Sequence, residues 1–146
     1  MPTIYRTSAS SRRAERMSFV STNPLVLVAD DHDDSRAIAR VVLESANFRV
    51  VEARTGPEAV RMVRAEKPAI VLLDIVMPEL NGWEVARCVR ADPASRSTIL
   101  IAVTALAGAT DREWSLAAGC DELLTKPVHP RTLLATLRRY VGEVMP

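Results

Sequence analysis

The stretch Leu25–Asp34, "LVLVADDHDD", joins a wholly apolar run to four carboxylates within five positions. An apolar run rich in Val and Leu predicts a strand that is buried on both faces of a sheet. Asp30 and Asp31 follow this strand directly, while Asp33 and Asp34 fall at the start of a helix, where carboxylates cap free N–H groups. Because like charges this close repel one another, either water solvates the acids or a cation binds among them.

Short apolar runs recur along the chain after this stretch, and segments with helical spacing separate them. Such alternation predicts an α/β fold: a doubly wound sheet of five parallel strands with five helices on its two faces. In sheets of this kind the functional crevice lies beyond the carboxyl ends of the strands. The predicted strands are Leu25–Ala29, Arg49–Ala53, Ala69–Leu73, Thr98–Val103 and Asp121–Leu124.

The predicted helices carry apolar stripes that should face the sheet. Gly56 and Gly82 mark the starts of two helices, and Gly119 marks the end of another. The phase of the pattern leaves Trp114 open between a core position and an exposed one. The stripes consist of Ile38, Val41, Val42 and Ser45; of Ala59, Val60 and Val63; of Val85, Ala86 and Val89; and of Leu133, Leu134, Leu137, Tyr140 and Val141.

The composition is that of one soluble globular domain: 146 residues, 48% hydrophobic and 25% charged, with a net charge of +1. A balance this close to neutral argues against direct DNA binding, which favours a strongly basic face. Cys88 and Cys120 are too few for a disulfide framework, and no apolar run approaches the roughly 20 residues that span a bilayer. The sequence therefore predicts a cytoplasmic protein that does not enter a membrane.

The chain begins with an Arg- and Ser-rich stretch in which four arginines stand against the single acid Glu15. This stretch lacks the apolar segment of a secretory signal. A transit peptide shares its composition, but a disordered leader is the simpler interpretation. We predict a disordered leader over residues 1–23 and a folded domain over residues 24–146.

Polar side chains stand at the carboxyl ends of three other predicted strands. Asp74 ends the third strand, Thr104 ends the fourth, and Lys126 follows the fifth. At one edge of a parallel sheet they would join Asp30 and Asp31. Mg²⁺ prefers oxygen ligands and would relieve the repulsion among the three acids. The set predicts a phosphoryl-transfer site, with Asp74 as the nucleophile, Lys126 neutralising phosphoryl oxygens and Thr104 donating a hydrogen bond.

Four motifs, in this order, resemble those of the receiver domains of two-component response regulators: "VADD", "LLDIVMPELNG", "TA" and "KP". The resemblance runs from about Leu25 to Val141. It implies a flavodoxin-like topology and a phosphoacceptor signalling domain that is not an enzyme, although such domains promote their own phosphorylation and dephosphorylation.

The resemblance also implies roles at the acidic site. Asp74 would accept a phosphoryl group from a phosphohistidine on a sensor histidine kinase or a histidine phosphotransfer protein. Asp31 would coordinate Mg²⁺ (or Mn²⁺) directly and Asp30 largely through water. The backbone carbonyl of Val76 would complete the protein ligands.

A second set of roles concerns the conformational switch. Thr104, followed by the small Ala105, would move toward the phosphoryl group, and Lys126 would pair with it. The Lys126–Pro127 peptide bond would be cis. Leu123 departs from the family, which usually has Tyr or Phe three residues before the lysine. This departure puts the usual signalling through the fourth helix, fifth strand and fifth helix in doubt.

We therefore expect a modest response to phosphorylation, centred on residues 105–118 with the loop Ala105–Ala109 at its start. The chain ends at "GEVMP" soon after the last helix. The expectation is a single-domain response regulator, a monomer or weak dimer, that signals to an unknown downstream protein or relays the phosphate.

Three alternatives remain at this stage. A Mg²⁺-dependent phosphatase with an aspartyl nucleophile would need a second acid two residues on, where Val76 stands. A flavodoxin-like nucleotide binder would need a Ser/Thr/Gly-rich loop where the four acids stand. A receiver fold could also serve only as a protein-interaction module, although the full set of acceptor residues weighs against it.

His32 and His129 are interpreted as exposed loop residues and not as ligands or phosphodonors.

Overall fold

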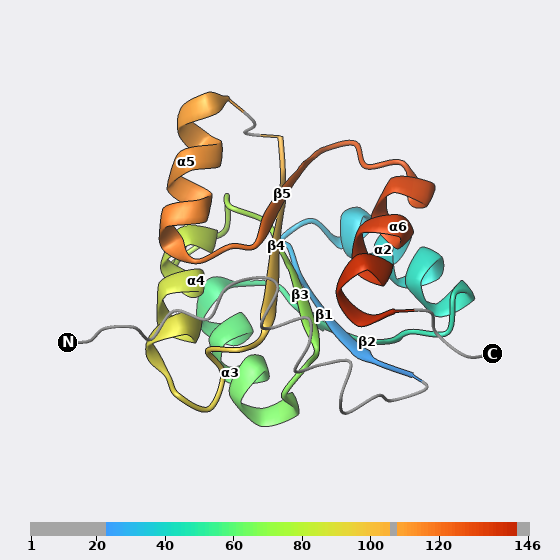
Figure 1. Ribbon diagram of the computed structural model, residues 1–146, viewed down its shortest axis with the longest axis horizontal. Coiled ribbons are helices and arrows are strands. Elements are labelled where there is room, and N and C mark those ends of the chain that lie inside the picture. The colour runs from blue at the N-terminus through green and yellow to red at the C-terminus, as the bar shows by residue number, and fades with distance from the viewer. Residues whose placement is uncertain (1–22, 106–107, 143–146) are drawn as a thin grey trace.

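The computed structural model describes residues 23–105 and 108–142. The predicted leader up to residue 22, two residues of the predicted loop Ala105–Ala109 and residues 143–146 lie outside this part of the chain. Within the described residues strands and helices alternate (Figure 1): β1 Leu25–Ala29, α2 Asp33–Ser45, β2 Arg49–Ala53, α3 Gly56–Glu66, β3 Ile70–Leu73, α4 Gly82–Ala91, β4 Ile99–Thr104, α5 Ala109–Ala118, β5 Glu122–Thr125 and α6 Pro130–Val141.

The five strands form one parallel sheet in the order β2-β1-β3-β4-β5. This confirms the predicted doubly wound fold, and each strand lies within one residue of its predicted bounds. The chain moves outward in one direction from β1 to β2 and in the other from β3 to β5. The order therefore reverses between β1 and β3, and the ends of these two strands flank the expected crevice.

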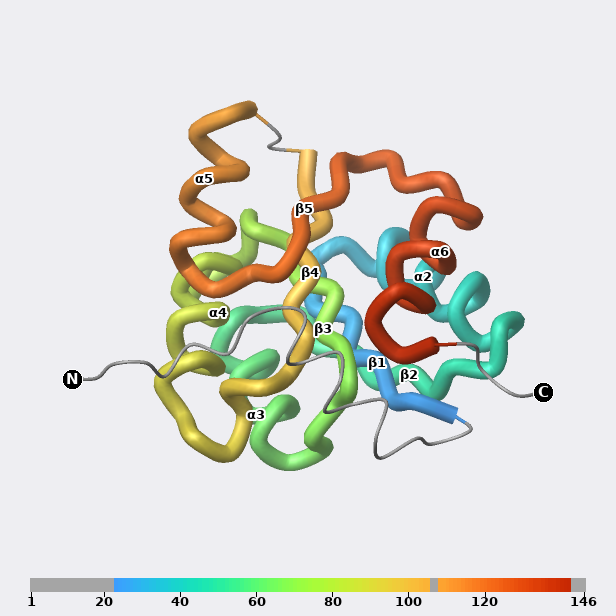
Figure 2. Tube along the Cα trace, in the orientation of Figure 1, coloured from blue at the N-terminus to red at the C-terminus, as the bar shows by residue number. Residues whose placement is uncertain are grey.

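Two helical layers enclose the sheet. Helices α2 and α6 cover one face, and α3, α4 and α5 cover the other, with the strands passing between them (Figures 1 and 2). Successive strand residues point to opposite faces. Thus Leu27 and Leu73 pack with Val85 of α4 in one core, whereas Val26 and Ile70 pack on the other face. The stripes predicted for α3, α4 and α6 contribute to these two cores.

Local sequence explains how α3 and α4 begin. The Thr55 hydroxyl accepts a hydrogen bond from the Glu58 amide at the start of α3. At α4, Asn81 and Glu84 form a reciprocal capping box. A Cβ at Gly82 would lie 2.4 Å from the Asp74 carbonyl oxygen, so only glycine lets α4 approach the end of β3 this closely. Helix α4 is therefore set directly against the backbone of Asp74.

The stripe predicted on α2 is wrong in part. Ile38 and Val41 are 65% and 69% exposed, whereas Leu43 is fully buried and Val42 is partly buried. The buried face includes Arg36, which is only 4% exposed. The buried face contains an arginine, so the solvent-facing side with Ile38 and Val41 looked more apolar in the sequence. Hydrophobicity alone therefore predicted the wrong side of the helix as buried.

The position of Trp114 is settled by the structure. It lies on α5 and is 54% exposed. Its ring meets that of Trp83 on α4 edge to face, with the centroids 5.0 Å apart. The Trp83 indole N–H donates to the buried Ser115 hydroxyl at 2.9 Å. An aromatic pair and a hydrogen bond therefore join α4 to α5.

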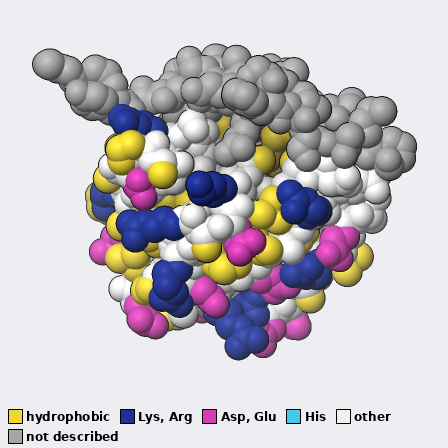
Figure 3. Space-filling model, turned by 90° about the horizontal axis from the view of Figure 1, so that it is seen from below, with side chains coloured by type: hydrophobic (Ala, Val, Ile, Leu, Met, Phe, Trp, Pro, Cys, Tyr) yellow, Lys and Arg dark blue, Asp and Glu magenta, His cyan; other side chains and the backbone are white. Residues whose placement is uncertain are grey.

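The surface carries both signs of charge. Seen from below, Lys and Arg side chains are interspersed with Asp and Glu side chains over the described part of this face (Figure 3). This mixed surface accords with the net charge of +1. Among the helices in residues 23–105 and 108–142, none has the length and apolar character needed to cross a membrane.

The corrected face of α2 can be tested by truncating one residue from each side of the helix. Leu43→Ala should lower the free energy of unfolding by about 2–5 kcal/mol, because it leaves a cavity in a packed core. Val41→Ala removes an exposed side chain and should change it by less than about 0.5 kcal/mol. Urea denaturation of both variants measures the difference. Similar losses in the two would mean that this face of α2 is assigned wrongly.

Candidate acidic site at the carboxyl edge of the sheet

Two carboxylates are held at the edge of the sheet by the backbone of adjacent strands. The Asp30 amide donates to the Ala53 carbonyl at 3.0 Å, and the Asp74 amide donates to the Ala29 carbonyl at 2.9 Å. Ala29 and Leu73 are paired in register, so the residues that follow them emerge side by side. Asp30 and Asp74 are each only 5% exposed.

Lys126 joins these two carboxylates. Its amide donates to the Thr104 carbonyl at 2.9 Å, which places it past the end of β4. Its Nζ lies 2.6 Å from Asp30 Oδ2 and 2.9 Å from Asp74 Oδ2. Burial alone would lower the pKa of Lys126, but hydrogen bonds to Asp30 and Asp74 outweigh it and raise that pKa. The ammonium therefore stays charged and offsets the repulsion between the two acids.

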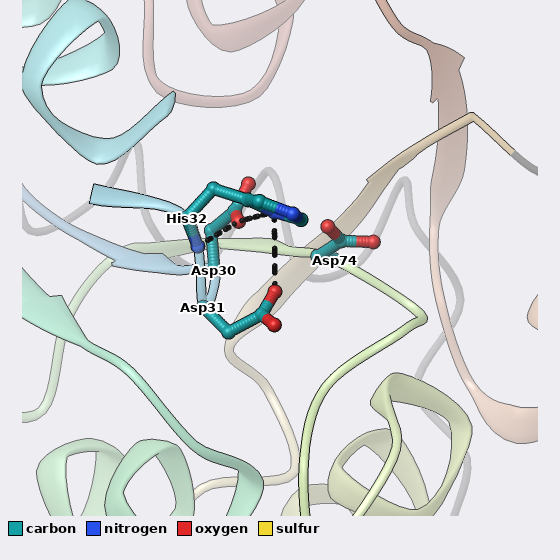
Figure 4. A group of neighbouring side chains, drawn as sticks. All are labelled: Asp30, Asp31, His32 and Asp74. Atoms are coloured by element: carbon teal, nitrogen blue, oxygen red, sulfur yellow. Dashed lines mark hydrogen bonds and ion pairs between the residues drawn. The ribbon is translucent and has the colours of Figure 1, made fainter. Parts of the chain in front are cut away.

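Asp31 and His32 complete the cluster (Figure 4). His32 Nδ1 lies 3.1 Å from Asp30 Oδ1 and 3.2 Å from Asp31 Oδ1. The His32 amide also donates to Asp30 Oδ1 at 2.8 Å. As predicted, the His32 side chain is exposed, by 67%, but it also contacts both acids.

The donor set fits a hard divalent cation. One ligand atom from each of Asp30, Asp31, His32 and Asp74 lies within 4.8 Å of the others. Three of the four groups are carboxylates, which Mg²⁺ and Mn²⁺ prefer. Asp31 is one-third exposed at its side chain and can meet an ion from solvent. The fourth group is an imidazole, a ligand more typical of transition metals such as zinc or iron.

The other predicted site residues lie in or shortly after β3, β4 and β5. Thr104 is 1% exposed at the end of β4, and Ala105 after it is exposed. Val76 has an exposed side chain, and its amide donates to Asp74 Oδ1 at 3.1 Å. Leu123 is 3% exposed and belongs to the core beneath α3, α4 and α5. The Lys126–Pro127 peptide bond is cis.

The sequence interpretation missed two residues near the site. The contact of His32 with Asp30 and Asp31 could have been predicted, because this histidine stands between two acidic pairs in "DDHDD". Arg36 lies behind the acidic loop, where its Nη1 donates to the Asp30 carbonyl at 2.7 Å. Its spacing of seven residues from Leu43 places the two on one helix face and was the available signal. His129, by contrast, is exposed and caps the start of α6.

Comparison with known protein families shows which family this chain belongs to. The response regulator receiver domain family matches residues 26–138. This chain belongs to that family. The receiver domain is 37% identical over 117 residues to protein PilH of Pseudomonas aeruginosa, covering 80% of this chain and 97% of PilH. It is 30% identical over 118 residues to the polar-differentiation response regulator DivK of Brucella anthropi, covering 81% of this chain and 96% of DivK.

Solved structures show the same relationship. The chemotaxis protein CheY4 of Vibrio cholerae superposes with a TM-score of 0.77 at 28% identity, over 81% of this chain and 98% of that one. The receiver domain of a Pseudomonas aeruginosa sensor histidine kinase gives a TM-score of 0.77 at 30% identity, over 83% and 99% of the two chains. That domain was solved with a magnesium ion coordinated in its active-site cleft.

The charge balance of the site can be tested with Lys126→Met. In the absence of divalent cations, this change should lower the free energy of unfolding by about 1–3 kcal/mol, because it leaves two buried carboxylates without their shared donor. The matched control is Lys67→Met, which removes the same charge from an exposed residue at the end of α3. Equal effects on urea denaturation would show that Lys126 does not stabilise the carboxylate pair.

Proposed function

We propose that this receiver domain accepts a phosphoryl group on Asp74 in a reaction that depends on Mg²⁺ or Mn²⁺. The donor is a phosphohistidine on a sensor histidine kinase or a histidine phosphotransfer protein. The observation that carries the proposal is the cluster itself, in which a buried Asp74 shares the Lys126 ammonium with Asp30 and has Asp31 beside it. In this role the chain works in the cytoplasm, where ATP drives histidine phosphorylation.

The reaction is a displacement at phosphorus. A carboxylate oxygen of Asp74 forms the new P–O bond as the P–N bond to the donor imidazole breaks, and the imidazole leaves with the electron pair. A divalent ion held by Asp30, Asp31 and Asp74, with the Val76 carbonyl, would supply positive charge to the phosphoryl oxygens. The bound magnesium of the Pseudomonas kinase receiver domain supports this assignment.

Two side chains of this chain stabilise the transferring group. Lys126 already lies 2.9 Å from an Asp74 oxygen, and its charge offsets the negative charge that builds up on the phosphoryl oxygens. Thr104 ends the neighbouring strand and supplies a hydroxyl that donates to one of these oxygens. Because Lys126 also binds Asp30, its movement toward the phosphoryl group changes the contacts of the acidic loop.

The signal to other proteins follows from the movement of Thr104 and Lys126. Movement of Thr104 and Lys126 pulls on the segment that leads from β4 into α5 and on β5 before α6. Leu123 offers no ring to fill the space that Thr104 leaves, so the response is modest, at the low end of about 1–3 kcal/mol. The domain signals through α5, β5 and α6 to a downstream protein or passes the phosphate on.

The alternatives are less well supported. A receiver fold kept only for protein interaction has no need for a lysine ammonium between two buried acids. An aspartyl phosphatase would use an acid at the position of Val76, whose side chain is apolar and exposed.

A docking surface for the donor lies beside Asp74. A pocket of about 460 Å³ extends from Asp74 and Lys126 between α2 and the start of α6. Its walls are mostly apolar and include Ile38, Val128 and Leu133. Ile38 is also one of the most exposed large hydrophobic residues of the described chain. We infer that an apolar helix face of the donor protein covers this pocket during transfer.

Phosphorylation can be tested with acetyl phosphate and Mg²⁺. We expect one base-labile acyl phosphate on Asp74, seen by intact-mass and peptide mass spectrometry. It should be missing when EDTA replaces Mg²⁺ and in Asp74→Asn, because both remove a part that the reaction needs. The control is Asp34→Asn, which changes an exposed carboxylate in the first turn of α2 and should still be phosphorylated. An alkali-stable phosphate, or one on Ser or Thr, would contradict the mechanism.

Donor docking can be separated from the chemistry by the choice of donor. Ile38→Glu should slow transfer from a phosphorylated histidine phosphotransfer protein by about tenfold or more, because it buries a charge in an apolar contact. Its rate with acetyl phosphate should stay unchanged. Leu116→Glu places the same charge on α5 in the opposite helical layer and should leave both rates intact. A similar loss with both donors for Ile38→Glu would place the defect in the site and not in docking.

A further inference from the structure

Arg36 is a buried cation beneath the acidic loop. It lies in the first turns of α2 and is only 4% exposed. A guanidinium so deeply buried requires acceptors for its donors, since an unpaired buried charge is strongly destabilising. Burial alone would lower its pKa, but hydrogen bonds to Asp33 and Glu52 raise it above its usual value. Arg36 is therefore always charged.

Its three nitrogen atoms contact three different parts of the site. Nη1 donates to the Asp30 backbone carbonyl at 2.7 Å, and this bond is buried. Nε donates to Glu52 of β2 at 2.9 Å, and Nη2 pairs with Asp33 in the first turn of α2. The planar fork thus ties the β1–α2 loop to the neighbouring strand.

These contacts fix the residues on both sides of Asp31. Before Asp31, the Asp30 amide is bound to Ala53 and the Asp30 carbonyl to Arg36. After it, Asp33 is bound to the same guanidinium. The backbone of Asp30 is thus held at both its amide and its carbonyl, and the first turn of α2 is held to the same guanidinium.

We propose that Arg36 is a positioning residue for divalent-cation binding at this site. It holds the backbone of the acidic loop so that Asp30 and Asp31 present their carboxylates toward Asp74. The inference rests on the proposed cation site and adds to it a residue that contacts neither the ion nor the phosphoryl group.

The direction in which the Mg²⁺ affinity changes when Arg36 is replaced distinguishes a positioning role from a purely electrostatic one. A cation close to a metal site repels the metal, so removing its charge should strengthen Mg²⁺ binding on Coulombic grounds alone. Loss of positioning should weaken Mg²⁺ binding. Arg36→Lys keeps the charge but cannot reach three acceptors, and Arg36→Gln removes the charge as well. Positioning predicts weaker binding in both variants.

Arg40 provides a matched control one turn further along α2. It donates to the other Glu52 oxygen at 2.6 Å and to Glu44 at 2.8 Å. It therefore shares an acceptor with Arg36, but its second contact is with its own helix instead of the acidic loop. Arg40→Lys and Arg40→Gln repeat both chemical changes without touching the Asp30 carbonyl.

The test is a calorimetric Mg²⁺ titration of the full chain and of these four variants, with Asp31→Ala as a variant that lacks a proposed ligand. Arg36→Lys and Arg36→Gln should bind Mg²⁺ about 10-fold more weakly, the loss typical of residues that orient metal ligands. The two Arg40 variants should remain within about twofold of the original chain. Circular dichroism establishes that each variant is folded.

The outcomes separate this inference from the proposed function. If the original chain binds no Mg²⁺, or Asp31→Ala binds it equally well, the cation site itself is wrong. If the original chain binds Mg²⁺ and Arg36→Lys binds it equally well, positioning by Arg36 is overturned. Tighter binding by Arg36→Gln would also overturn it, because Arg36 would then act only as a repelling charge.

A measurement on the original chain covers the case in which the Arg36 variants do not fold. Coupling is reciprocal, so Mg²⁺ binding should also tighten the contacts of Arg36. In NMR spectra, the Arg36 Nε–H signal should shift and exchange more slowly with water as Mg²⁺ is added, whereas that of Arg40 should hardly change. An unaffected Arg36 signal during saturating Mg²⁺ binding would exclude the proposal.

Discussion

Two carboxylates that share one ammonium group at the edge of a parallel sheet are the constraint on which the rest of this site depends. Asp30 and Asp74 are almost fully buried, and their neighbouring strands bring them together whether or not their charges repel. Burial of two like charges is costly unless each has partners. Lys126 supplies the shared partner, and the backbone amides of His32 and Val76 supply one more for each acid.

The same constraint explains the surroundings of the site. Strand β5 lies two places from β3, so its lysine has to extend past the end of β4 to reach Asp74. On the side of α2, Arg36 places a second positive charge near the acids by donating a hydrogen bond to the Asp30 backbone carbonyl. The two cations leave the solvent side of the cluster to Asp31, whose carboxylate remains accessible. This arrangement supports the proposed binding of a divalent cation beside Asp74.

Much of this arrangement could be predicted from the sequence, because residues that follow parallel strands emerge at one edge whatever the side-chain packing is. Asp30, Asp74 and Lys126 therefore lie where the strand pattern placed them. The phase of α2 could not be predicted in the same way. Hydrophobicity favoured Ile38 and Val41. The structure instead buries Arg36, because Glu52 of β2 and the Asp30 carbonyl just after β1 accept its hydrogen bonds there. The spacing of Arg36 from Leu43 marks the buried face, but only the contacts with these distant segments show that an arginine can be buried there.

The tryptophan pair gives this protein an optical property of its own. Trp83 and Trp114 are the only two tryptophans in the chain, and their rings touch across the boundary between α4 and α5. Helix α4 starts against the backbone of Asp74, and α5 follows the strand that ends in Thr104. Two indoles 5.0 Å apart at a steep angle couple their excited states, and their emission and near-ultraviolet dichroism depend on that geometry. The spectrum of the tryptophan pair therefore reports on the relative position of α4 and α5 without any added label.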